Sequence, residues 1–445
     1  MWTDSLGHPV SLQHAGSLAG VNDFVEGFIA SQARVGNILD TAATDEAPLV
    51  QAYAAALHMF AETGAASITA RPFLDKALAS PLQPTARERS FIAAVQAWVE
   101  GDVLRSASVL ERHVRDHPRD LVALKLAHYH LFNLGDAPGM LRLALECLPA
   151  AGDVAYLHGM LAFGWEQCHL LEQAEASARH AIAMERAEPW AHHALAHVML
   201  TQGRVREGQQ FLSEVSDSWV GLNSFMVTHN WWHQALFGLE LEQHDEVLSL
   251  YDEQVWGVAK DYSQDEVNAV SLLARLELAG ADVGERWQDL ADHLLLHTDD
   301  QVLPFLDMQY LYGLAKAGRP QAERLLRNIE THASRVPAGV RHAWQRVCVP
   351  ASRGLLAHAR GDWQRAVDEL GLALPRLTEI GGSHAQRDLF SQVYLDALIH
   401  NRNLAAAQHL LQQQLRGQPE SLRLKRQVAR VYQGLGLGAL AAGLA

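Results

Sequence analysis

Residues 189–212 decide the fold, and they read PWAHHALAHVMLTQGRVREGQQFL. Pro189 suits the first position of a helix, because the backbone N–H that proline lacks would have no partner there. Gly203 can adopt the left-handed conformation that ends a helix. A second amphipathic helix follows, with these residues on one side: Val205, Gly208, Phe211 and Leu212. Because no period-two strand pattern of useful length occurs, we expect an all-α protein.

The same punctuation recurs along the chain: a turn residue, a charged residue, then an alanine and an apolar stripe. It occurs at 101–102, 135–136, 203–204, 244–245, 318–319, 361–362 and 401–402, and a looser copy with Ala174 lies near 170–171. The first steps are about 33 to 35 residues, the tetratricopeptide period, and later steps lengthen to about 40. We therefore predict a tetratricopeptide-type α-solenoid, a right-handed superhelix of helix-turn-helix repeats. It would form one domain over residues 1–445, with residues 1–20 irregular.

Composition narrows the possible partners and compartment. The chain is 49% hydrophobic and 20% charged, and its net charge is 36 − 51 = −15. A negative field disfavours nucleic acid and anionic membranes, so we expect neither as a partner. Three scattered cysteines make no disulfide or zinc framework: Cys147, Cys168 and Cys348. No signal peptide or membrane-spanning run is visible, so we expect a cytoplasmic protein.

Several motifs carry a resemblance to a known family. They are HPRDL at 117–121, YLHGMLAFG at 156–164, WAHHALAHV at 190–198, HNWWH at 229–233 and GGSHAQRD at 381–388. Together they resemble the tetratricopeptide repeat protein 38 family over essentially the whole chain. The resemblance implies the fold and no particular activity. The family pattern also has an Asp-x-His pair near 305–312, whereas here Asp307 is followed by Gln309.

A concave groove is expected on the first helix of each repeat. Counting back from the turn places aromatic, histidine and acidic side chains there instead of the polar mixture that grips a peptide carboxylate. The predicted groove residues are Lys125, Tyr129, Tyr156, His158, Phe163, Glu166, Trp190, Trp232 and Asp307. An inter-repeat core position is the alternative for Trp232, because tryptophan has a large apolar body.

Two histidine pairs stand out among the 24 histidines. His193 and His197 are four residues apart, and His229 and His233 repeat that spacing one repeat later. Residues i and i+4 share a helix face, and neighbouring first helices pack side by side, so the two pairs can converge. We predict a site for a divalent metal such as zinc. The alternative is that these histidines only pack between helices.

The segment 381–388 contains a capping box, Ser383-x-x-Gln386, after two glycines. Superhelical winding would bring this segment over the groove, so that His384 and Arg387 face the histidine pairs. If the protein is an enzyme, we predict that His384, Arg387 and Glu166 are its catalytic residues.

Two functions remain open on the sequence. The first is a binding protein whose groove holds a peptide, a protein partner or a small molecule. The second is a metal-dependent hydrolase of a small amide or ester, with the histidine pairs as the metal site. Most repeat proteins are scaffolds, which favours the first.

Overall fold

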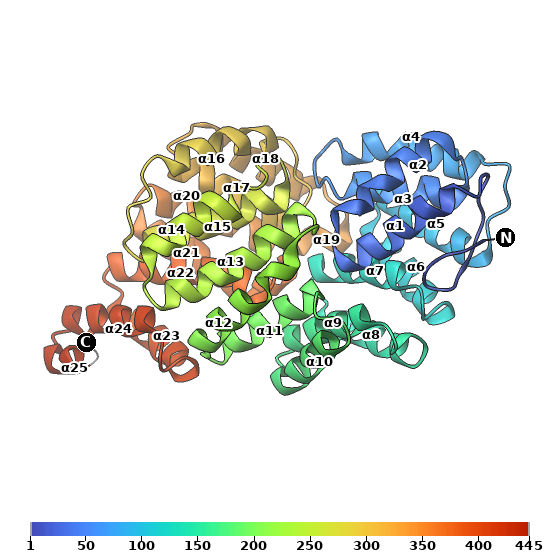
Figure 1. Ribbon diagram of the computed structural model, residues 1–445. Coiled ribbons are helices and arrows are strands. Elements are labelled where there is room, and N and C mark those ends of the chain that lie inside the picture. The colour runs from blue at the N-terminus through green and yellow to red at the C-terminus, as the bar shows by residue number, and fades with distance from the viewer. Residues whose placement is uncertain (1, 444–445) are drawn as a thin grey trace. The chain divides into compact units, whose positions relative to one another are not determined.

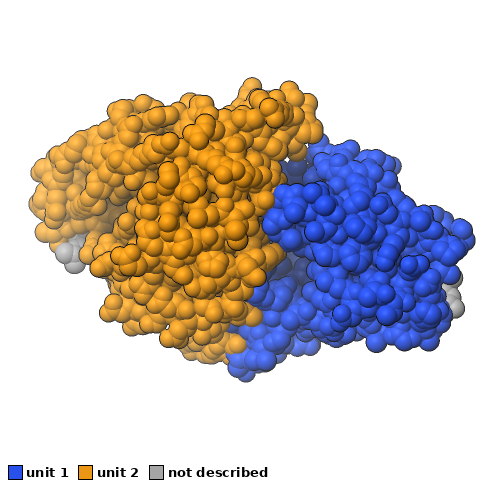
Figure 2. Space-filling model, turned by 90° about the horizontal axis from the view of Figure 1, so that it is seen from above, with its two compact units in different colours: residues 1–195, 217–226 blue, residues 196–216, 227–445 orange. Residues whose placement is uncertain are grey.

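The computed structural model describes residues 2–443, and α-helices make up most of it (Figure 1). By its contacts the chain divides into two compact units, residues 1–195 with 217–226 and residues 196–216 with 227–445 (Figure 2). The prediction of one superhelical domain over residues 1–445 concerns how these units are joined, and it stays a prediction.

Unit 1 begins with a short hairpin of β1 (Trp2–Thr3) and β2 (Pro9–Val10), paired antiparallel. Residues 1–20, which were expected to be irregular, thus include two short strands and the start of a helix. The helices of this unit are α1 (Ser17–Ala30), α2 (Ile38–Thr44), α3 (Pro48–Met59), α4 (Ala66–Ala79), α5 (Ala86–Val99), α6 (Val103–Asp116), α7 (Leu121–Asn133), α8 (Ala137–Ala151), α9 (Ala155–Gln167) and α10 (Leu171–Met184). A 3-10 turn, η1 (Ala33–Asn37), links α1 to α2.

Two helices, α11 (Pro189–Thr201) and α13 (Ser224–Glu240), run through the boundary between the units. Unit 2 continues with α12 (Val205–Val215), α14 (His244–Leu250), α15 (Ser263–Leu278), α16 (Arg286–Leu294), α17 (Pro304–Lys316), α18 (Gln321–Arg335), α19 (Ala338–His342), α20 (Val349–Ala359), α21 (Trp363–Ala373), α22 (His384–His400), α23 (Leu404–Gly417), α24 (Leu422–Gly434) and α25 (Gly438–Ala442). Short 3-10 or π segments complete it: η2 (Ser216–Trp219), η3 (Tyr251–Val255), η4 (Leu295–His297), η5 (Ala343–Cys348) and η6 (Leu374–Ile380).

The repeat punctuation has a physical cause in the helix ends. Gly135 has φ +75°, which ends α7, and the next residue, Asp136, accepts a hydrogen bond from the Gly139 N–H at the start of α8. Gly361 (φ +72°) and Asp362 do the same between α20 and α21. Glycine tolerates the left-handed conformation, and aspartate satisfies an exposed N–H of the next helix. The tetratricopeptide-type helical hairpins predicted from this pattern are confirmed.

One repeat was missed by that pattern, the pair α15 and α16. Its turn glycine, Gly280, has φ +93° as the pattern requires. It is followed by Ala281, however, and α16 begins only at Arg286. The apparent step from 244 to 318 therefore contains two repeats.

Hairpins pack closely where a glycine faces an aromatic ring. Gly208 on α12 lies against the ring of Phe237 on α13, and a Cβ at Gly208 would overlap that ring. Phe237 has no exposed surface, so its ring has little room to move. This close approach sets the spacing of the two helices.

Replacing Gly208 by alanine should destabilise the protein by about 1–3 kcal/mol, the usual cost of overpacking a core. Urea unfolding followed by circular dichroism measures the loss. Gly438→Ala is the matched control, because nothing lies within 4 Å of a Cβ there. Equal stability of the two variants would contradict the packing described.

Candidate metal centre

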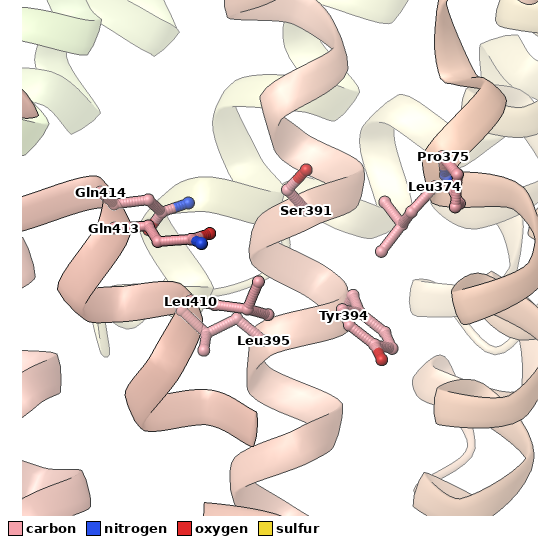
Figure 3. Close-up of a pocket in the computed structure, with 8 residues that line it drawn as sticks. All are labelled: Leu374, Pro375, Ser391, Tyr394, Leu395, Leu410, Gln413 and Gln414. Atoms are coloured by element: carbon pink, nitrogen blue, oxygen red, sulfur yellow. The ribbon is translucent and has the colours of Figure 1, made fainter. Parts of the chain in front are cut away.

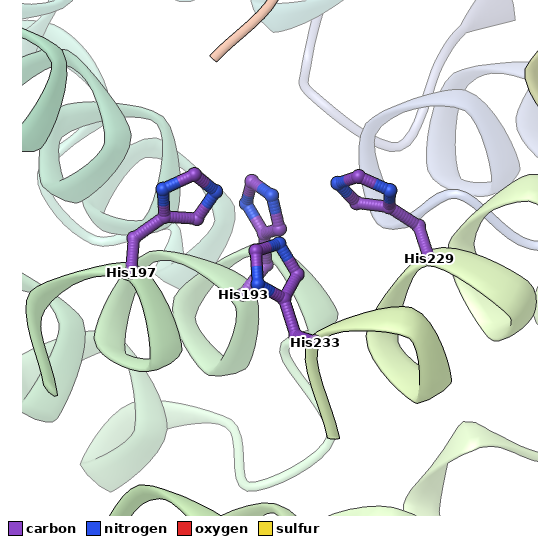
Figure 4. A group of neighbouring side chains, drawn as sticks. All are labelled: His193, His197, His229 and His233. Atoms are coloured by element: carbon purple, nitrogen blue, oxygen red, sulfur yellow. The ribbon is translucent and has the colours of Figure 1, made fainter. Parts of the chain in front are cut away.

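The two histidine pairs lie on α11 and α13. His197, His229 and His233 belong to unit 2, and His193 lies one turn before His197 on the same continuous helix. One ring nitrogen from each of the four lies within 4.8 Å of those of the other three. Figure 4 shows the imidazoles of α11 and those of α13 turned toward one another. The predicted convergence of the two pairs is thus present in the structure.

The four imidazoles are removed from solvent. Their exposed fractions are 1% for His193, 1% for His197, 3% for His229 and 0% for His233. The rings of His197 and His233 lie 4.5 Å apart between centroids, and those of His229 and His233 lie 4.9 Å apart. The four histidines are therefore not surface residues.

His229 is held by a polar chain that reaches α15. Its Nδ1 lies 3.0 Å from Oδ1 of Asn268. The Thr228 hydroxyl donates to Oδ1 of Asp265, so the hydroxyl oxygen is left to accept a weak bond from the Asn268 Nδ2, at 3.5 Å. That order aims the Asn268 carbonyl oxygen at His229. His229 therefore carries its proton on Nδ1 and keeps the lone pair on Nε2.

Burial lowers the pKa of His229 to about 3, and the neighbouring His197 also lowers it, against a raising effect of the Asn268 bond. His229 is consequently neutral at physiological pH. A neutral imidazole whose second nitrogen donates to a carbonyl oxygen has the arrangement usual for a metal ligand. The site thus offers the nitrogen chemistry that zinc and similar ions prefer.

Trp232 lies beside these histidines and is fully buried. Its indole stacks on His229 with centroids 5.2 Å apart and planes 8° apart, and it meets His233 edge-on at 4.9 Å. The guanidinium of Arg275 lies 5.4 Å from the indole centroid. Trp232 belongs to the packed core of unit 2, as the core alternative predicted, instead of lining an open groove.

Part of the predicted groove in unit 1 is filled by the chain itself. The Lys125 ammonium donates to the Phe28 carbonyl (2.5 Å), the Ile29 carbonyl (3.1 Å) and the Ser31 hydroxyl (2.8 Å) at the end of α1. The Trp190 indole N–H donates to the same Ser31 hydroxyl at 3.0 Å. Burial lowers the pKa of Lys125 to about 7, but all three donors of the ammonium have acceptors. These bonds give Lys125 a structural role in holding α1.

The other predicted groove residues of unit 1 have varied surroundings. The Tyr129 hydroxyl donates to Oε1 of Glu62 at 2.8 Å. His158 bonds the Gly152 carbonyl at the end of α8 at 2.9 Å, so it serves that helix end instead of the groove. Tyr156 is half-buried, and burial raises its pKa to about 12.

Phe163 and Glu166, also on α9, were predicted to line the groove. Phe163 is buried and lies 5.1 Å from His193 between ring centroids. Glu166 is fully buried, and its Oε2 accepts from the Gln167 amide at 2.5 Å. A catalytic role for Glu166 stays a prediction.

The segment 381–388 forms the expected capping box at the start of α22, with Ser383 and Gln386 bonding each other's backbone N–H. Arg387 donates to the carbonyls of Gly381 and Gly382, and it lies 3.2 Å from Nδ1 of His384. These bonds stabilise the turn before α22. Catalytic roles for His384 and Arg387 stay predictions.

Asp307 lies in the core of unit 2, 1% exposed. Burial raises the pKa of its carboxyl well above the ordinary value, and the charge of Asp300 adds to the rise. Among residues 2–443 neither carboxyl oxygen has a hydrogen-bond partner. Asp307 does not belong to the four-histidine group, and its place in a groove stays a prediction.

An ionic cluster near Asp307 was not predicted from the sequence, and it consists of His297, Glu266 and Asp300. Nε2 of His297 lies 2.8 Å from Glu266, and its Nδ1 lies 2.6 Å from Asp300. Burial alone would lower the pKa of His297, but the bonds and charges of Asp300 and Glu266 outweigh it and raise the pKa to about 9. His297 is therefore a buried cation between two carboxylates.

A pocket of about 330 Å³ lies elsewhere in unit 2 (Figure 3). It is lined by Leu374, Pro375, Ser391, Tyr394, Leu395, Leu410, Gln413 and Gln414. Its lining contains neither histidine nor carboxylate, so it offers none of the chemistry of the histidine group.

Solved structures similar to this chain include helical-repeat proteins, and no family model matches it. The human IFIT1 dimer with m7Gppp-AAAA is 11% identical with a TM-score of 0.43, covering 99% of this chain and 96% of that one. The human IFIT1 dimer with PPP-AAAA is 11% identical with a TM-score of 0.41, covering 85% of each chain. Naa15/Naa10 bound to HypK-THB is 13% identical with a TM-score of 0.25, covering 96% of this chain and 68% of that one.

The expectation of no nucleic-acid partner is corrected. Two of these helical-repeat structures hold the oligonucleotides m7Gppp-AAAA and PPP-AAAA. The exclusion rested on net charge alone, and net charge describes the far field, whereas binding depends on the charges inside a site.

Within residues 2–443, none of the helices combines the length and apolar character that crossing a bilayer requires.

Removing the Ser31 hydroxyl should destabilise unit 1, because the Lys125 ammonium and the Trp190 indole would lose an acceptor. Ser31→Ala should cost about 1–3 kcal/mol in urea unfolding. Ser31 has φ +55°, so Ser31→Gly, which lacks the hydroxyl but suits that conformation, should cost about 1 kcal/mol less. Unchanged stability in both variants would contradict the anchoring of α1.

The His297 cluster predicts a pH dependence of stability. Its folded pKa lies above the value of about 6.5 in an unfolded chain. Its contribution is therefore complete below about pH 6.5 and is lost as the pH rises through about 9. Unfolding free energies between pH 6 and 10 should fall more steeply for the wild type than for His297→Gln. His409→Gln, at an exposed site, should follow the wild type, and parallel curves for wild type and His297→Gln would refute the assignment.

Proposed function

We propose that this tetratricopeptide-type protein is a binding protein whose functional centre is a divalent transition-metal ion, with zinc the best fit. His193, His197, His229 and His233 would be its ligands. The observation that carries the proposal is the convergence of four buried imidazole nitrogens within 4.8 Å. Two i, i+4 pairs on adjacent helices supply the four nitrogen donors of a tetrahedral site.

The geometry fits after a small contraction. Zinc–nitrogen distances of about 2.0–2.1 Å place tetrahedral nitrogens about 3.4 Å apart, so the rings would move inward by about 1 Å or less. The Asn268 bond favours the His229 tautomer whose lone pair is on Nε2.

The motifs quoted above support a finer assignment, membership of the tetratricopeptide repeat protein 38 family, which we include in the proposal. The cytoplasm remains the proposed compartment. A hydrolase function is not included, because none of the bonds described for Glu166, His384 and Arg387 assigns them a substrate.

Metal content and affinity test this proposal. Purified untagged protein should bind one equivalent of zinc per chain in a competition titration with a chromophoric chelator. A His197→Ala/His233→Ala double variant should lose this binding, because two neutral ligands disappear. His409→Ala, at an exposed site, is the matched control and should bind as the wild type does.

Two further results should accompany binding. Asn268→Leu should weaken zinc affinity by about 10–100-fold, the usual effect of removing a partner of a metal ligand. Zinc at 100 times its dissociation constant should stabilise the folded wild type by about 2.7 kcal/mol. If neither zinc, iron nor manganese binds, or if the double variant binds zinc as tightly as the control, the histidines are packing residues.

A further inference from the structure

The following inference rests on the proposed metal centre and concerns what else that centre binds. Its four ligands are imidazoles, and an imidazole that binds a metal ion does so as a neutral ligand. The ligand set therefore contributes no negative charge to offset a dication. With exposures of 3% or less, water does little to screen that charge. An uncompensated buried charge is costly, so the loaded centre favours an added anion.

A hydrogen-bond donor lies next to the centre. The indole of Trp232 stacks on His229 and meets His233, both at about 5 Å between centroids. The side chain is fully buried, and among the described residues its Nε1–H has no acceptor. A buried tryptophan N–H normally has a partner, because leaving it without one is destabilising.

Arg275 adds positive charge at the same place. Its guanidinium lies 5.4 Å from the Trp232 ring centroid and is 3% exposed. It donates to neutral oxygens, those of Ser271 and the Ala385 carbonyl. The carboxylates that act on its pKa, Asp388 and Glu240, do so through space. The indole therefore contacts both a cation and the proposed metal ligands.

We propose that the metal-loaded centre binds one small carboxylate anion, which occupies a fifth coordination position and accepts a hydrogen bond from Nε1 of Trp232. Zinc is usually tetrahedral, and at catalytic sites it can expand to five ligands. The anion would offset the charge of the ion and satisfy the indole donor together. Because the histidines and Trp232 are buried, the anion that we propose is a short carboxylate.

Cobalt(II) substitution makes the proposal measurable, since the visible absorption of this ion reports its coordination number. Acetate is the probe, and acetamide, of equal shape but without charge, is its control. Acetate should change the absorption of the cobalt protein in a saturable way, whereas acetamide should not. Trp232→Phe keeps an aromatic ring but lacks the N–H, and it should weaken acetate binding by about tenfold.

The outcomes separate this inference from the proposed function. Failure of the wild type to take up cobalt would overturn the metal centre and this inference with it. Cobalt uptake with identical spectra in acetate and acetamide would overturn the anion site alone. Equal acetate affinity in wild type and Trp232→Phe would overturn the role of the indole. Circular dichroism of the variant shows whether it folds, and the wild-type comparison of acetate with acetamide decides the anion site without it.

Discussion

Each helical hairpin of this protein can bury its apolar face only against its neighbours. Successive first helices therefore lie side by side, and a side chain on one helix meets the matching face of the next. In unit 2 this contact brings the rings of His197 and His233 within 4.5 Å. The i, i+4 spacing on each helix adds a second imidazole one turn away, so four imidazoles meet. The candidate metal centre is thus a consequence of repeat packing combined with one repeated spacing.

Burying four imidazoles and a tryptophan without regard to polarity would destabilise the core. Hydrogen bonds from α15 reduce that cost at His229. Thr228 and Asp265 orient Asn268, and Asn268 orients His229. A purely packing role for His229 would not require a defined tautomer, whereas a metal ligand does. The polar chain to α15 is for this reason the strongest local argument for ligand chemistry at the centre.

Sequence reasoning located the hairpins because their signals are local. Gly135 with Asp136 and Gly361 with Asp362 end one helix and begin the next, and each residue type has its own physical reason to be there. It also located the histidine pairs, because helical spacing and repeat adjacency are both readable from the chain. The repeat of α15 and α16 was missed because Gly280 lacks a following acidic cap. Because Asn268 and Arg275 lie on α15, they were not predicted as partners of His229 and Trp232.

The sequence did not predict that the end of α1 bonds to two of the groove residues. Lys125 and Trp190 were placed correctly on first helices, but the end of α1 bonds to both of them. Ser31 precedes Lys125 by 94 residues and Trp190 by 159. No local pattern encodes a contact across such distances, since it depends on how the chain returns on itself. The same holds for His297, whose two carboxylate partners come from α15 and the loop before α17.

The most direct measurement is X-ray absorption at the zinc edge of the zinc-loaded protein, which reports the atoms bound to the ion. We expect a first shell of nitrogen or oxygen at about 2.0–2.1 Å, with the outer-shell pattern of several imidazoles. The His197→Ala/His233→Ala variant should retain no zinc after dialysis, so the imidazole pattern should be absent from its spectrum. A shell containing sulfur, or one of oxygen atoms without imidazole scattering, would contradict the assignment of the four histidines as the metal ligands.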